Sequence, residues 1–62
     1  MTIEEQEEFR AAAIELAAAA RARGEDPDTA LAVRFEAARR RHPEDAGWLL
    51  CLRDQLGRRP VL

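Results

Sequence analysis

Residues 24–43 read GEDPDTALAVRFEAARRRHP and mark where the helices of this chain begin and end. Asp26 followed by Pro27 is an N-cap with proline at the first helical position, where a missing N–H costs nothing. Pro43 ends the same helix, because a proline forces the residue before it out of helical geometry. These signals predict a helix over residues 27–41. The apolar residues of its buried stripe recur at steps of four and three: Leu31, Phe35 and Ala38.

An upstream helix is expected from about Ile3 until Gly24, a natural left-handed stop. Thr2 and Glu5 have the capping-box spacing, in which the two side chains satisfy each other's backbone amides. Because alanine has little bulk, a second helix can pack closely against this one. Its predicted core-facing residues are Phe9, Ala12, Ala13, Leu16, Ala17, Ala19 and Ala20.

A third helix is expected to open with Pro43, Glu44 and Asp45 and to reach about Leu56, before Gly57 stops it. Its stripe of Leu49, Leu52 and Leu56 suffices to close a core. We therefore predict an all-α three-helix bundle, an antiparallel helical hairpin with a third helix packed across it. Residues 1–57 form this single domain, and residues 58–62 are a C-terminal tail.

The length, composition and charge of the chain limit the functions it can have. The chain has 62 residues and 7.0 kDa, too few for a self-contained enzyme with a deep cleft. It holds thirteen alanines, ten arginines and no lysine, a bias typical of a GC-rich, bacterial genome. The net charge of −2 hides an asymmetry, with eight acids and three arginines in residues 1–31 against four acids and seven arginines in residues 32–62. Such a chain can pair its own halves, or pair head to tail with a copy.

The cysteine count and the apolar runs of the sequence indicate the cellular compartment. The single Cys51 cannot form an internal disulfide, and no signal segment opens the sequence. Outside the alanine tract, the longest apolar run is residues 48–52, against the roughly 20 that a spanning helix needs. We expect a soluble cytoplasmic protein with no membrane partner.

Residues that resemble catalytic or metal-binding groups lack their usual companions. The first helix carries carboxylates one turn apart, but a helical di-metal site also needs Glu-x-x-His on facing helices, and the only histidine is His42. Cys51 lies between leucines with no identifiable base, which favours a buried or interfacial thiol. We expect no catalytic residue, no metal and no cofactor, and hence no enzyme.

Nucleic-acid binding is the alternative function. A helix-turn-helix protein inserts the N-terminal end of its second helix into the major groove, and here that end carries Glu44 and Asp45, which would face phosphate. With no lysine or tyrosine to build a phosphate track, this function stays the second choice. It would use Arg39, Arg40, Arg41, Arg58 and Arg59.

The third helix carries more apolar residues than its stripe needs. If the leucine stripe faces the hairpin, Trp48 and Leu50 project to either side, and tryptophan is enriched at interaction hot spots. The alternative is that the first helix covers Trp48. We therefore expect a small noncatalytic protein–protein interaction or assembly module that docks through its third helix onto another protein or a second copy of itself. The expected partner-binding residues are Trp48 as anchor, with Leu49, Leu50, Cys51 and Arg53.

Residues 24–56 also follow a repeat spacing. Gly24 stands at a helix break, the Leu31–Phe35–Ala38 steps follow, and Pro43 comes five residues after Ala38. This spacing resembles a tetratricopeptide repeat, although Glu15 falls upstream where that family has a bulky apolar residue. The resemblance implies a role in binding peptides or proteins, and stacking against further helices from a partner.

Overall fold

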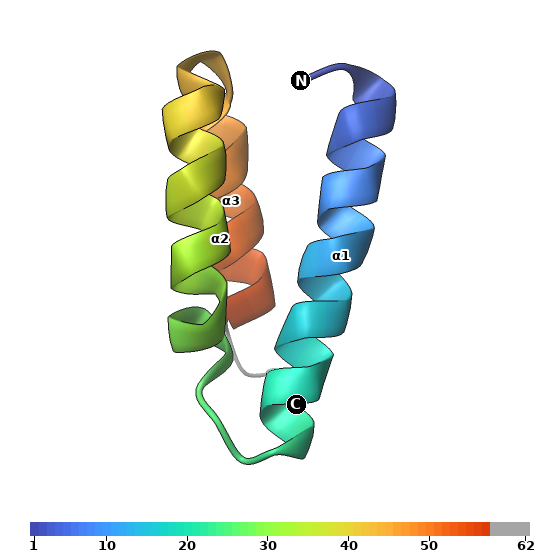
Figure 1. The fold of residues 1–62 in the computed structure, drawn as a ribbon, viewed down its shortest axis with the longest axis vertical. Coiled ribbons are helices and arrows are strands. Elements are labelled where there is room, and N and C mark those ends of the chain that lie inside the picture. The colour runs from blue at the N-terminus through green and yellow to red at the C-terminus, as the bar shows by residue number, and fades with distance from the viewer. Residues whose placement is uncertain (58–62) are drawn as a thin grey trace.

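The computed structural model describes residues 1–57 and shows three helices. They are α1 (Ile3–Ala22), α2 (Pro27–Arg41) and α3 (Ala46–Gly57), and a short 3-10 turn, η1 (Pro43–Asp45), precedes α3. In Figure 1, α1 and α2 run antiparallel as a hairpin, and α3 turns back alongside α2. The predicted all-α three-helix bundle is confirmed, and residues 1–57 contain no strand. The predicted tail, with Arg58 and Arg59, lies outside the described residues.

The ends of α1 and α2 are where the sequence predicts them. The Oγ1 of Thr2 accepts a hydrogen bond from the Glu5 amide at 3.1 Å, and Glu5 Oε1 accepts one from the Thr2 amide at 2.8 Å. After α1, Gly24 adopts a φ of 75°, a left-handed conformation that favours glycine. At the start of α2, Asp26 Oδ2 accepts from the Thr29 amide at 3.1 Å. Helices α1 and α2 therefore each begin on a side-chain cap.

The start of the third helix differs from the prediction. Residues 43–45 form a 3-10 turn instead of the first α-helical turn, and the Asp45 amide donates to the His42 carbonyl at 2.9 Å. A bond between residues three apart is the 3-10 pattern, which is common where a chain enters an α-helix. The α-helix itself begins at Ala46 and includes Gly57.

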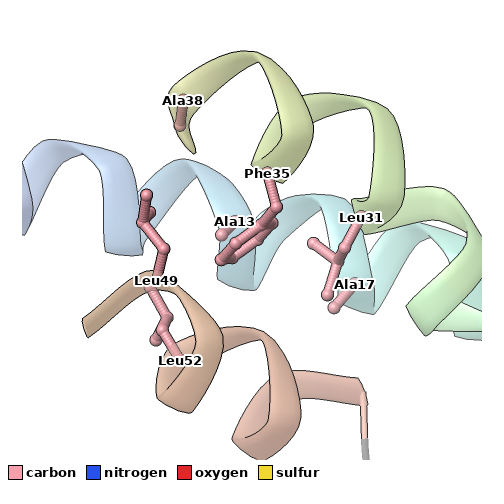
Figure 2. Close-up of a cluster of buried hydrophobic side chains, with 7 residues drawn as sticks. All are labelled: Ala13, Ala17, Leu31, Phe35, Ala38, Leu49 and Leu52. Carbon is pink, nitrogen blue, oxygen red and sulfur yellow. The ribbon is translucent and has the colours of Figure 1, made fainter. Parts of the chain in front are cut away.

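The core is small and half of its residues are alanine. Figure 2 shows how α1 contributes only Ala13 and Ala17 to the main cluster, while α2 and α3 supply the larger side chains. The predicted stripe of α2 is confirmed in full, but Phe9 and Leu16 of α1 are only partly buried, at the edge of the cluster. The buried apolar residues are Ala13, Ala17, Ala20, Leu31, Phe35, Ala38, Leu49 and Leu52.

Polar contacts fasten α3 to the hairpin at both ends. Arg53 Nε donates to Asp28 Oδ1 at 2.9 Å, and an Arg53 Nη to Asp28 Oδ2 at 3.3 Å, which joins α3 to the start of α2. An Arg21 Nη donates to the Leu56 carbonyl at 2.6 Å, which joins the end of α1 to the end of α3. At the opposite end, the amino group of Met1 pairs with Asp45. These contacts hold α3 in a defined rotation about its axis.

Candidate interaction surfaces

A core this small leaves large apolar side chains on the surface. Val33 is 80% exposed and Leu50 is 70% exposed, and each lies at an open groove beside α2. Ile3 and Ile14 are also exposed, and neither lines a groove. The described residues thus present two candidate docking surfaces, on different sides of the same helix.

The first groove lies between α2 and α3 and has a volume of about 230 Å³. Phe35 and Leu49 are buried residues at its floor, and Leu50 stands exposed at its rim. Charged groups surround it. The residues that line the groove are Phe35, Glu36, Arg39, Ala46, Gly47, Leu49, Leu50 and Arg53.

The predicted anchor Trp48 is partly covered by α1. Its ring centroid lies 6.0 Å from that of Phe9, and the Phe9 ring makes an edge-on contact with Phe35 at 5.0 Å. Trp48 therefore helps to close the core, and its role as an anchor stays a prediction. Leu49 was expected on the docking surface as well as in the core. Leu49 is 2% exposed and lies at the floor of the α2–α3 groove, so its role in partner binding stays a prediction.

The remaining predicted partner-binding residues of α3 are accessible. Leu50 and the Cys51 thiol are both exposed in this chain alone, so the interfacial alternative for the cysteine stays a prediction. Arg53 is half-buried, and the carboxylate of Asp28, which accepts hydrogen bonds from the guanidinium, raises the pKa of Arg53. A charge held in this way gives the rim of the groove a fixed geometry.

The second groove lies between α1 and α2, and sequence reasoning missed it. Its volume is about 830 Å³, and its apolar surface includes the partly buried Phe9 and Leu16 and the exposed Val33. The sequence feature that could have indicated this groove is Val33, an apolar residue that lies outside the buried stripe of its helix. The lining residues are Met1, Glu5, Glu8, Phe9, Ala12, Leu16, Ala30, Val33, Arg34, Ala37, Ala38, Arg41 and His42.

The two walls of this second groove carry opposite charge. The α1 wall supplies Glu5 and Glu8, whereas the α2 wall supplies Arg34 and Arg41. The Glu5 carboxylate accepts from the Thr2 amide, and this bond lowers the pKa of Glu5. None of the ion pairs within residues 1–57 involves Glu8, Arg34 or Arg41. Three charges at the rim of an apolar groove therefore have no ion-pair partner within residues 1–57.

A cluster of possible metal ligands lies at the η1 end of the bundle. One ligand atom each from His42, Glu44 and Asp45 lies within 4.8 Å of the others. The Met1 amino group pairs with both carboxylates, and its hydrogen bond to Asp45 raises the pKa of that amine. His42 Nδ1 lies 3.5 Å from Glu44 Oε2. The cluster is thus an internal ion-pair network between the chain start and η1.

The arginines at the end of α2 do not form one patch. Arg39 lines the α2–α3 groove and Arg41 lines the α1–α2 groove, because consecutive helical residues point about 100° apart. Glu44 and Asp45 follow directly, as the sequence indicated. The nucleic-acid alternative stays a prediction.

No family model matches the chain, and no match was found among the curated proteins or the solved structures. The resemblance to a tetratricopeptide repeat therefore stays a prediction. Within residues 1–57, no helix combines the length and apolar character that crossing a membrane requires.

Proposed function

We propose that this chain is a noncatalytic protein-interaction module that docks onto another protein through the α2–α3 groove, with Leu50 as its anchor. The observation that carries the proposal is the 70% exposed Leu50 beside a groove with a buried apolar floor. Removing an exposed apolar side chain from water is favourable, so a partner that covers Leu50 gains free energy from that burial. At about 230 Å³, the groove fits single apolar side chains of a partner.

The surroundings of Leu50 support a prearranged surface. The Asp28–Arg53 bonds fix one rim of the groove, so little side-chain freedom is lost when a partner binds there. Arg39 and Glu36 offer opposite charges along the α2 edge. These charges would set the orientation of a partner, while Leu50 would supply most of the contact energy.

Cys51 gives a direct test, because it is exposed, adjacent to Leu50 and the only cysteine of the chain. A photoreactive group attached to its thiol is expected to cross-link the partner in a lysate of the native host. Leu50→Glu should abolish this product, whereas Ile14→Glu, at an exposed site on α1 outside both grooves, should preserve it.

The identified partner is then purified and its affinity measured. Leu50→Glu should weaken the Kd at least about tenfold, a hot-spot effect, with the helical circular dichroism unchanged. Equal affinity for the wild-type and Leu50→Glu proteins would contradict the proposal, and so would the lack of any cross-link that depends on Leu50.

A further inference from the structure

We propose that the α1–α2 groove binds the same groove of a second copy of this chain. The two copies are related by a two-fold axis parallel to the helices. This arrangement places α1 of each copy antiparallel on α2 of the other. The two hairpins then form a four-helix bundle at the interface. The proposal concerns a different surface from the Leu50 groove and stands or fails independently of it.

Charge selects this pairing. The charged side chains of the α1 wall are acidic and those of the α2 wall include Arg34 and Arg41, so α1 on α2 sets Glu8 of one copy against Arg34 of the other, twice per dimer. Neither side chain has an ion-pair partner within residues 1–57. The N-terminal, positive end of the α1 dipole also meets the C-terminal end of α2.

The positions of Glu8 and Arg34 along the helix axes agree with this ion pair between the two copies. Phe9 and Phe35 are in contact at 5.0 Å, so Glu8 and Arg34, their chain neighbours, lie within about one helical turn of the same height. A two-fold axis parallel to the helices leaves heights unchanged. Glu8 of one copy therefore comes level with Arg34 of the other, within reach of an arginine side chain.

The other face-to-face arrangement is disfavoured. A two-fold axis across the helices would stack α2 on α2, and because Arg34 lies in the middle of α2 it would meet the Arg34 of the second copy. It would also leave Glu8 without a cation. Like charges at this position oppose association, so the charges discriminate between the two geometries.

Apolar groups give the dimer its contact area. Val33, 80% exposed in one chain, would be covered by the partly exposed apolar residues along α1 of the other, including Ala12 and Leu16. The small side chain of Ala12 leaves room for Val33. The Leu50 grooves stay outside this contact, so each dimer would present two of them.

The first test is the mass in solution. Light scattering on the full chain is expected to show a dimer that dissociates on dilution, and added salt should weaken it. Val33→Glu should weaken dimerisation at least about tenfold, whereas Ile14→Glu should leave it unchanged. Circular dichroism at high concentration checks that each variant is helical. A wild-type protein that stays monomeric at every concentration overturns the proposal.

The second test asks whether α1 of one copy packs on α2 of the other. Glu8→Arg and Arg34→Glu are each expected to weaken the homodimer about tenfold, because two like-charge contacts replace two ion pairs. An equimolar mixture of the two variants restores both ion pairs and should dimerise about as tightly as the wild type. If the mixture stays as weak as the single variants, or if neither variant is weakened, the α1-on-α2 arrangement is wrong.

Discussion

Leu31→Ala removes a fully buried side chain from the core. Leu31 is 0% exposed and is the largest fully buried residue, and the close-up in Figure 2 shows it on the side of α2 that faces Ala17 of α1. The alanines opposite it are attached to a rigid helix and have no side-chain length with which to fill a void. The cavity would therefore remain largely open.

The expected loss of stability follows from that geometry. Three buried carbon atoms at about 0.8 kcal/mol each contribute about 2.4 kcal/mol of lost transfer free energy. The unfilled cavity raises the total to about 3–4 kcal/mol, within the range for buried leucines. A domain of this size has only a few kcal/mol to lose, so the variant should be largely unfolded at room temperature.

Urea unfolding followed by circular dichroism measures this loss, with the chain concentration held equal for all variants. Leu50→Ala is the matched control, because it makes the same chemical change at a side chain that is 70% exposed. The control should lose less than about 0.5 kcal/mol. A Leu31→Ala protein destabilised by under about 1 kcal/mol would refute the assignment of Leu31 to the core.

Three further predictions concern the helix ends. Thr2→Ala removes one half of the capping box and should cost about 1 kcal/mol of unfolding free energy in urea, while an unchanged midpoint would show that the cap contributes nothing. The bond from the Thr2 amide lowers the pKa of Glu5 below its ordinary 4.5. The Glu5 carboxylate therefore stabilises the folded state fully above pH 4.5, and this contribution is lost as the pH falls through the lowered pKa of the folded state. Urea midpoints from about pH 6 to pH 3 should drop more steeply for the wild type than for Glu5→Gln, and parallel curves would exclude this contribution. Gly24→Ala meets no atom within 4 Å but forces a φ of 75° on alanine, so a thermal melt should show about 1 kcal/mol of destabilisation, and a variant as stable as the wild type would contradict the left-handed cap.

Local signals account for what could be predicted of the fold. Caps, prolines and glycines act within a few residues, so the bounds of α1 and α2 follow from the neighbourhoods of Thr2, Gly24 and Asp26. The stripe of α2 likewise needs only helical periodicity. The 3-10 turn at residues 43–45 escaped prediction because an α-helix and a 3-10 turn begin with the same residue types.

The candidate surfaces depend on how far each helix rotates about its axis, which local patterns do not fix. Trp48 and Leu49 are neighbours in sequence, yet their exposure is set by Phe9 and by the position of α2. The Asp28–Arg53 pair joins residues 25 positions apart and holds α3 in its rotation. The α1–α2 groove is lined by residues from both helices, so no single segment of the sequence reveals it.

The small core connects the fold to the proposed association. Four of its eight buried residues are alanine, so burial within one chain supplies little free energy. Covering Val33 and the edges of Phe9 and Leu16 in a dimer would add apolar burial in a place where the single chain has little. We therefore expect the thermal stability of the wild type to rise with chain concentration.

Binding of a second copy of this chain at the α1–α2 groove is tested most directly by a dilution series followed by amide chemical shifts. We expect amides near Val33, Ala37 and Leu16 to shift with concentration, in step with a fall in mass from a dimer toward 7.0 kDa, while those of α3, which contributes no residue to this groove, do not. Shifts and mass that are independent of concentration would contradict the self-association, and changes confined to residues outside the groove would place it on another face.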